Sequence, residues 1–241
     1  MKVISGIDAA WLVPELASIP GVAGSRGPVL VWRFAQPVRS ISSAIVGGGI
    51  GLCNWVLNVT VDPLYSRLDP AVHIAEVAES LGLVGPGIGL LTAVDVGTHR
   101  VHSVGGTTVV GTVGVSMPVW AFDPGEPLLP HRSDGTNVPG PTPPPPGTIN
   151  LVCFVEQRLS DAALVNAVTT ISEAKAQAMY ARGAPGTGTA SDAVCVLCPT
   201  GGIEEIFGGP RSYWGARLAS ASYEAVVSGI DRQRHANGMR S

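Results

Sequence analysis

The chain has 241 residues, of which 45% are hydrophobic and only 14% charged, and its formal net charge is −3. This length and composition predict a folded chain of one large domain or two small ones and exclude disorder of the whole chain. Scattered arginines without a basic surplus argue against nucleic-acid binding. Every apolar run is interrupted well before the roughly 18–20 residues of a membrane-spanning helix. We therefore expect neither a nucleic-acid nor a membrane partner.

The N-terminus and the cysteines predict a cytoplasmic protein. Lys2 is followed by Asp8 and Glu15 instead of the apolar run of a secretion signal. Cys195 and Cys198 are spaced as C-x-x-C, but they lie in an apolar run that predicts a strand. Residues three apart on a strand face opposite sides, so we expect no zinc or redox site there.

The N-terminal half predicts strands around one helix. Val- and Ile-rich runs indicate strands at residues 28–34 and 40–46, separated by Gln36-Pro37, and further strands at 54–61, 87–96 and 107–115. Asp69 and Pro70 are typical of a helix start, and this helix extends to about residue 81. Its predicted apolar positions are Val72, Ala75, Val77, Ala78 and Leu81.

The C-terminal half follows a connection rich in Pro and Gly at about residues 122–147. Strands are then predicted at 148–155 and 193–197, and helices from a Ser160 cap to about 180, closed by Gly183, and from about 213 to 234. Strands and helices alternate through the whole chain. The sequence therefore predicts a single α/β (α+β) domain over residues 1–241, with mixed sheets and helices on the outer faces.

The helix that begins at Ser160 carries an unusual lysine. Its apolar stripe includes Leu164, Ile171 and Met179, and Lys175 fills the missing step. A buried ammonium must be paired or lose its proton, which makes Lys175 a site candidate. The alternative is a side chain that reaches solvent from the end of the stripe.

Further polar residues stand near this lysine. Glu173 lies on the polar face of the helix, which would line a site only if another segment covered it. The connection Gly186-Thr-Gly-Thr-Ala-Ser-Asp192 offers hydroxyl donors, flexible glycines and a carboxylate at a strand entrance. No lysine and helix follow it, so it is not a typical phosphate loop. His73, His99 and His102 have no spacing that indicates a metal site.

Motifs along the chain resemble those of one enzyme family. In the C-terminal half they are Gly147-Thr-Ile-Asn150, Leu159-Ser160, Ser172-Glu-Ala-Lys175 and Thr187-Gly-Thr-Ala-Ser-Asp-Ala193. In the N-terminal half they are Ser42-Ser43-Ala44, Gly47-Gly48-Gly49, Asn54, Asn58 and Leu91-Thr92-Ala93. This set, in this order, resembles the adenosylcobinamide amidohydrolase family of cobalamin salvage. The proline-rich residues 139–146 depart from the family pattern.

The resemblance implies hydrolysis of the amide between a corrin propionate and aminopropanol, which converts adenosylcobinamide to adenosylcobyric acid. The corrinoid is then the small-molecule substrate and no cofactor is expected, while a metal requirement and a homo-oligomer are left open. Amide hydrolysis needs an attacking oxygen, donors for an oxyanion and an acid for the departing amine. We predict Glu173 or Asp192 as the base, Lys175 as the acid or oxyanion partner, and water or Thr148 as the attacking group.

Thr148 and Asn150, with the amides of Thr187 to Thr189, are predicted to hold the substrate carbonyl. The full set of predicted substrate-binding residues is Gly48, Gly49, Asn54, Asn58, Thr92, Asn150, Thr187 and Thr189.

The order of these elements is also similar to that of self-processing aminopeptidases and ornithine acetyltransferases, which have an αββα architecture. That likeness favours αββα layering and implies a second hypothesis, in which Thr148 becomes an N-terminal nucleophile after cleavage behind Gly147. Two further hypotheses are a corrinoid-binding protein without turnover and a peptide or small-amide hydrolase on the same scaffold.

Overall fold

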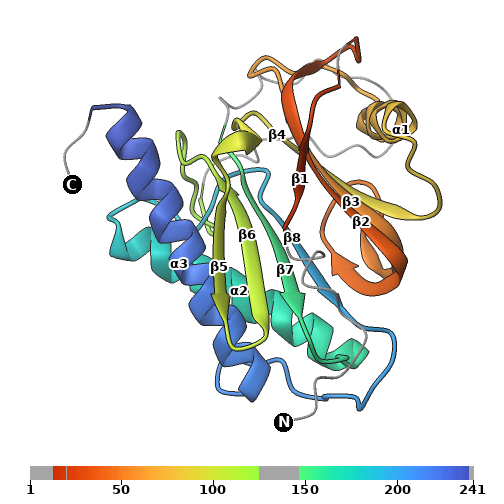
Figure 1. Ribbon diagram of the computed structural model, residues 1–241. Coiled ribbons are helices and arrows are strands. Elements are labelled where there is room, and N and C mark those ends of the chain that lie inside the picture. Colours follow the sequence, from red (N-terminus) through yellow and green to blue (C-terminus); the bar gives the residue numbers. More distant parts are fainter. Residues whose placement is uncertain (1–12, 20, 125–146, 239–241) are drawn as a thin grey trace.

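The computed structural model describes residues 13–19, 21–124 and 147–238, and its named strands form one mixed sheet (Figure 1). The strands are β1 (Glu15–Ala17), β2 (Ser25–Ser42), β3 (Gly49–Val61), β4 (Gly87–Thr92), β5 (Arg100–Val104), β6 (Thr107–Val113), β7 (Ile149–Val155) and β8 (Ala193–Cys198). Their order is β4-β3-β2-β8-β7-β6-β5, with β1 paired to β2. The α-helices are α1 (Pro70–Ser80), α2 (Asp161–Ala181) and α3 (Tyr213–Ala236).

The sheet bends so that its two halves face each other. One buried cluster joins the inner faces of β2, β3 and β4 to those of β6, β7 and β8, and its aromatic centre is Trp32, Phe34 and Phe154. A second cluster joins the opposite faces of β2 and β3 to α1, and a third joins those of β6, β7 and β8 to α2 and α3. The layers are therefore α, β, β and α, as predicted, but both β layers belong to one continuous sheet.

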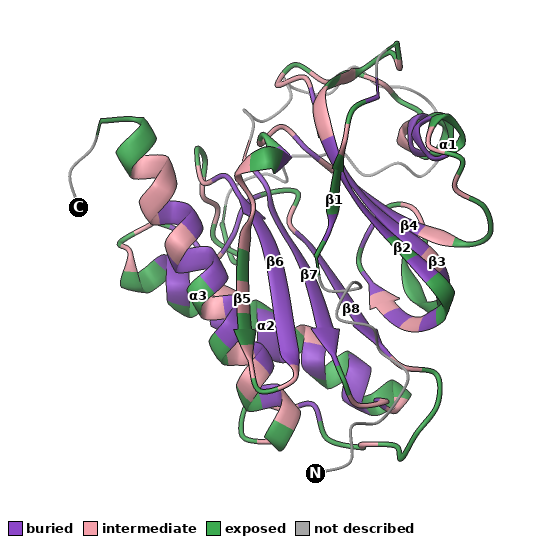
Figure 2. Ribbon diagram, viewed as in Figure 1, coloured by how far each residue is buried: buried purple, intermediate pink, exposed green. Residues whose placement is uncertain are grey.

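The C-terminal helices begin and end as predicted. Ser160 caps α2 by accepting a hydrogen bond from the Ala163 amide at 3.1 Å, and Ser212 caps α3 in the same way. Gly183 follows α2 with a φ of +61°, a conformation that favours glycine. Figure 2 shows both helices burying the side that faces the sheet. Because β7 and β8 are parallel neighbours, α2 is the crossover that connects them.

The sequence predicted two strands where the structure has one, and that prediction is wrong. Strand β2 runs without a break from Ser25 to Ser42, because Gln36-Pro37 falls in an irregularity of its pairing with β3 between Arg33 and Val38. A bulge is one of the few places in a sheet that accept proline. Strand β2 also ends before residue 46, and β3 begins at Gly49, five residues earlier than predicted.

Other strands differ at their ends or were not predicted. Strand β4 stops at Thr92, and a 3-10 turn from Val96 to Thr98 follows it. Strands β1 and β5 were not predicted from the sequence. The Pro/Gly-rich connection predicted at about residues 122–147 lies largely outside the described residues.

Helix α1 exists as predicted and buries part of the predicted face. Val77 and Ala78 are buried and Leu81 packs against the same cluster, whereas Val72 is 50% exposed and Ala75 is also exposed. The prediction missed His73 and Ile74, which take the buried places of Val72 and Ala75 because they lie one turn before Val77 and Ala78 on the same face of the helix. Asp69 occupies the cap position, but its carboxylate pairs with Arg67 and not with the helix amides.

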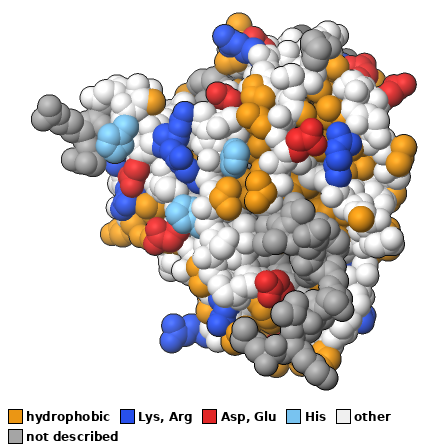
Figure 3. Space-filling view, viewed as in Figure 1, with side chains coloured by type: hydrophobic (Ala, Val, Ile, Leu, Met, Phe, Trp, Pro, Cys, Tyr) orange, Lys and Arg blue, Asp and Glu red, His pale blue; other side chains and the backbone are white. Residues whose placement is uncertain are grey.

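The two cysteines of the C-x-x-C spacing lie on opposite faces of β8, as the strand prediction required. Cys195 points into the inner cluster and Cys198 into the cluster beneath α2 and α3, which confirms that the pair faces opposite sides of β8. Burial raises the pKa of the Cys195 thiol well above its usual value. Charged side chains are dispersed over the face shown in Figure 3. Among the described residues, no helix is long and apolar enough to cross a membrane.

Candidate active site

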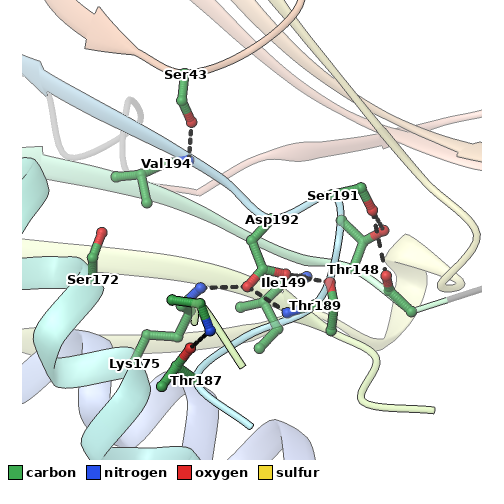
Figure 4. A network of polar contacts seen from close by, with 12 residues as sticks. Ser43, Thr148, Ile149, Ser172, Lys175, Thr187, Thr189, Ser191, Asp192 and Val194 are labelled. Atoms are coloured by element: carbon green, nitrogen blue, oxygen red, sulfur yellow. Dashed lines mark hydrogen bonds and ion pairs between the residues drawn. The ribbon is translucent and has the colours of Figure 1, made fainter. Parts of the chain in front are cut away.

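The lysine singled out from the sequence forms a buried ion pair. Helix α2 carries Lys175, and Asp192 stands immediately before β8. The Lys175 Nζ atom contacts Asp192 Oδ2, and the two side chains are 13% and 11% exposed (Figure 4). The ammonium is therefore compensated by a carboxylate, as its burial requires. Gly188 makes room for the pair, because a Cβ at that position would overlap both charged groups.

The Asp192 carboxylate also fixes the main chain around it. Its Oδ1 atom accepts a hydrogen bond from the Ile149 amide at 2.8 Å and another from the Thr189 hydroxyl. Its Oδ2 atom accepts one from the Thr189 amide at 3.0 Å, in addition to the Lys175 contact. A carboxylate offers about four acceptor positions, so these donors occupy all of them. Asp192 thus joins α2, the start of β7 and the connection before β8.

Two hydroxyls lie beside this ion pair. Thr148 Oγ1 and Ser191 Oγ are 2.8 Å apart, and Ser191 Oγ is 3.4 Å from the carbonyl oxygen of Gly147. Thr148 is 5% exposed, whereas Ser191 is exposed to solvent. Ser191 was not among the predicted site residues. The strand pattern contained a signal for it, because Asn150 pairs with Ala193, and extending that register by two residues places Ser191 opposite Thr148.

A second polar network lies between the two β layers. Asn150 Nδ2, on β7, donates to Asn58 Oδ1, on β3, at 3.0 Å and to the Leu91 carbonyl at 3.1 Å. Asn58 Nδ2 donates to Thr112 Oγ1 at 2.9 Å. Both asparagines are 1% exposed, and Asn150 Oδ1 has no partner among the described residues. Both amide protons of Asn150 are therefore committed, and its oxygen is the atom left to interact with another group.

Thr148 and Asn150 face the same side of β7, since they are two residues apart on an extended chain. By the same alternation, Asp192 shares its face of β8 with Val194 and Val196, which α2 covers, whereas Thr148 and Asn150 share the inner face of β7 with Val152 and Phe154. The Lys175–Asp192 pair and the asparagine network therefore approach the beginning of β7 from opposite faces of the sheet. This junction brings together four of the predicted residues in the first network, which are Thr148, Lys175, Thr189 and Asp192, and two in the second, which are Asn58 and Asn150.

Other predicted residues border this junction. Thr187 Oγ1 accepts a hydrogen bond from the Ala121 amide at 3.0 Å, and the Thr187 amide donates to the Val119 carbonyl at 2.9 Å. These contacts hold residues 119–121 against the connection that contains Gly188. Thr92 Oγ1 accepts a hydrogen bond from the Val94 amide at 3.1 Å and so closes the end of β4.

The N-terminal motif reaches the junction through the turn between β2 and β3. Within that turn, the Ser43 amide donates to the Val194 carbonyl and the Ser43 hydroxyl accepts from the Val194 amide, each at 3.0 Å. Gly48 and Gly49 are exposed on the same turn. Asn54 lies farther along β3. Its main-chain N–H donates to the carbonyl of Pro86, just before the start of β4, at 2.7 Å.

Glu173 lies apart from these networks. It is exposed on α2, and within the described part of the chain it makes no hydrogen bond or ion pair with them. Its neighbour Ser172 bonds only the Val168 carbonyl of its own helix, at 2.9 Å, and Figure 4 shows that hydroxyl separated from Asp192. The role predicted for Glu173 stays a prediction.

His73 and His102 lie outside the junction. His73 Nε2 contacts Ser25 Oγ at 2.8 Å, and its Nδ1 contacts the Tyr65 hydroxyl at 2.9 Å. His102 Nε2 contacts Ser228 Oγ at 3.0 Å on α3. Among the described residues, no three His, Cys, Asp or Glu side chains are grouped so that they could hold a metal ion.

The sequence of this mixed α/β domain matches a known class of amide hydrolases. Residues 18–238 match the model of the adenosylcobinamide amidohydrolase family, CbiZ. The chain therefore belongs to this family, and both polar networks lie inside the matched region.

Relatives of this chain carry the same family name. It is 38% identical over 143 residues to the adenosylcobinamide amidohydrolase of Halobacterium salinarum, a match that covers 59% of this chain and 58% of that protein. It is 27% identical over 195 residues to that of Methanosarcina mazei, covering 77% of this chain and 87% of that protein. The solved structure of the PH0078 protein from Pyrococcus horikoshii OT3 is 12% identical, with a TM-score of 0.42, and covers 90% of this chain and 82% of that one.

Proposed function

We propose that this protein hydrolyses the amide between a corrin propionate and aminopropanol in adenosylcobinamide, releasing adenosylcobyric acid and the amino alcohol. The family match over residues 18–238 carries this proposal and favours it over a corrinoid carrier or a peptide hydrolase. The few charges of the chain fit a large substrate that is mostly apolar and edged with amides. A cytoplasmic corrinoid-salvage role is part of the proposal.

The reaction centre is the junction at the start of β7. Amide hydrolysis needs an attacking oxygen, and the Thr148 hydroxyl lies 2.8 Å from that of Ser191, the residue before Asp192. Asp192 already accepts hydrogen bonds from Lys175, Ile149 and Thr189, so it has no free lone pair with which to activate water. Its role in the proposal is to position the chain around Thr148.

Lys175 supplies the positive charge at this junction. An ammonium has three N–H donors, and one is directed to Asp192, so two remain for the carbonyl oxygen of the substrate or for the departing amine. Positive charge aimed at a developing oxyanion stabilises the transition state more than the ground state. Lys175 therefore keeps the acid or oxyanion role predicted from the sequence.

Asn150 has a different role from the one predicted. Both of its amide protons are used inside the protein, so it cannot donate to the substrate carbonyl without breaking the bonds to Asn58 and Leu91. Its free Oδ1 is an acceptor, and the scissile group of the substrate is a secondary amide with one N–H. We assign Asn150 Oδ1 to that N–H, which requires the β layers to part when the substrate binds, because this oxygen is buried in the free protein.

The test is to incubate the purified protein with adenosylcobinamide and with non-adenosylated cobinamide, and to quantify aminopropanol and the corrinoid acid by mass spectrometry. The proposal predicts that the two products appear in equal amounts. Tight corrinoid binding without release of aminopropanol from either substrate would overturn it and favour a carrier.

A further inference from the structure

We infer that Ser191 is a second catalytic hydroxyl, which passes a proton between Thr148 and the departing amine. This inference rests on the proposed amide hydrolysis. It adds Ser191 to that proposal. Ser191 precedes Asp192 in the chain, and its hydroxyl had no role predicted from the sequence.

The hydrogen-bond directions follow from the two contacts of Ser191. A hydroxyl carries one proton and can accept through its lone pairs. The Gly147 carbonyl can only accept, so at 3.4 Å the Ser191 proton is directed to that oxygen. In the 2.8 Å contact either hydroxyl can donate, and when Ser191 donates to Gly147, Thr148 is the donor and Ser191 the acceptor. These hydrogen bonds then run from Thr148 to Ser191 and from Ser191 to the carbonyl. A proton that leaves Thr148 would follow the same path.

Burial places Ser191 on the outer side of this pair. Thr148 is 5% exposed, whereas Ser191 is exposed, so Ser191 is the hydroxyl of the pair that faces solvent. Its long contact with the Gly147 carbonyl leaves the Ser191 proton free to move to another acceptor. In the proposal that acceptor is the nitrogen of the substrate once the attack of Thr148 has made it basic.

The main chain holds Ser191 firmly on both sides. Asp192 follows it and is fixed by hydrogen bonds from Ile149 and Thr189 and by the ion pair with Lys175. Ala193 then begins β8 in register with Asn150. A hydroxyl held in this way needs little reorganisation during the reaction, which favours catalysis.

The proposed step balances in atoms and charge. The Thr148 oxygen attacks the amide carbon as its proton moves to Ser191 Oγ, and the proton of Ser191 moves to the nitrogen of the amide. The C–N bond breaks and gives an ester of the corrin propionate with Thr148 and free aminopropanol. Water then cleaves the ester by the reverse proton path, giving the carboxylic acid and restoring both hydroxyls.

The experiment compares wild type, Ser191→Ala, Ser191→Thr and Ser172→Ala in adenosylcobinamide hydrolysis. Ser172 is the matched control, because it is an exposed serine whose hydroxyl bonds only its own helix. We expect Ser191→Ala to lower kcat by about 100-fold or more, the size of a lost proton transfer, with KM within about 2-fold. Ser191→Thr restores the hydroxyl and should recover most of the rate, and Ser172→Ala should match wild type.

A purely structural role is separated by the solvent isotope effect. If two protons move together, a plot of the wild-type kcat against the fraction of D₂O in the solvent is curved. The same plot for the residual kcat of Ser191→Ala is a straight line. Thermal unfolding of each variant checks that it is folded. If wild type releases no aminopropanol, the proposed function fails. If wild type is active and Ser191→Ala matches Ser172→Ala, the inference fails and the function stands.

Discussion

Two polar clusters of this protein differ in how their charges are assembled. Around Lys175 and Asp192, the partners come from α2, β7 and the connection before β8, and the ion pair is 13% and 11% exposed. Around α1, Arg67 pairs with Asp69 at 2.9 Å and with Glu76 at 2.7 Å, and these side chains are 22%, 49% and 45% exposed. The ion pair of the first cluster is largely shielded from solvent, and the ion pairs of the second lie at the surface.

The difference separates a candidate site from a structural clamp. The buried pair stands beside two hydroxyls, one of them exposed, and the asparagine network begins two residues away on β7. In the α1 cluster, both ring nitrogens of His73 are engaged by Ser25 and Tyr65, and Arg67 also donates to the Ala23 carbonyl. These contacts attach α1 to the start of β2 and present no comparable group to a substrate.

The largest expected effect is that of Asp192→Asn. The substitution leaves a buried ammonium without its carboxylate, which costs about 3–5 kcal/mol of unfolding free energy. It also turns the acceptor of the Thr189 amide into an NH2 group, while Oδ1 can still accept from Ile149, so we expect activity to fall at least about 100-fold. Urea unfolding and the aminopropanol assay measure the two effects.

Because Asp192→Asn alone can unfold, the double variant with Lys175→Met is the second measurement. It should regain stability without activity, and activity near wild type in either variant would contradict the account.

A smaller effect is expected from Asn150→Ser. It breaks the bonds to Asn58 and Leu91 between the β layers, and leaving buried partners unsatisfied costs about 1–3 kcal/mol. It also removes the acceptor proposed for the substrate N–H. Wild type should therefore prefer the amide to an ester of the same acid, and the variant should lose much of that preference. Asn166→Ser, at an exposed position of α2, is the control, and an unchanged preference in Asn150→Ser would refute the assignment.

The α1 cluster should affect stability slightly and activity not at all. Arg67→Met removes exposed ion pairs with Asp69 and Glu76, which contribute little because water screens them. We expect a small decrease in the midpoint of thermal unfolding and an unchanged kcat. A loss of activity as large as that of Asp192→Asn would remove the distinction between the two clusters.

The smallest expected effect is a pH dependence from His73. Burial, and then the charge of Arg67, lower the pKa of this histidine below its usual value near 6.5. The unfolded chain therefore binds a proton near pH 6.5 that the folded chain resists, so this contribution to stability is present above that pH and declines below it. Thermal unfolding at pH 7.5 and 5.5 measures the loss. His73→Gln should show a smaller difference between the two pH values, and an equal difference would contradict the assignment.

The sequence predicted the parts of this arrangement that depend on local pattern. Caps and periodicity located α2 and α3, and the spacing on α2 indicated that Lys175 points toward the core. One feature depends on how the sheet bends and could not be predicted. It is the contact of Asn58 with Asn150, since alternation assigns faces to each strand but does not tell which faces meet. Ser191 was missed for another reason, because its place opposite Thr148 follows from the parallel register of β7 and β8, which the prediction did not use.

The most direct test of the central claim is aminopropanol release from adenosylcobinamide by wild type and by Lys175→Met. The account predicts that wild type forms equal amounts of aminopropanol and adenosylcobyric acid, and that the variant remains folded but is at least about 100-fold slower, since it lacks the charge beside the hydroxyls. A variant as fast as wild type would contradict the claim that this ion pair lies at the reaction centre.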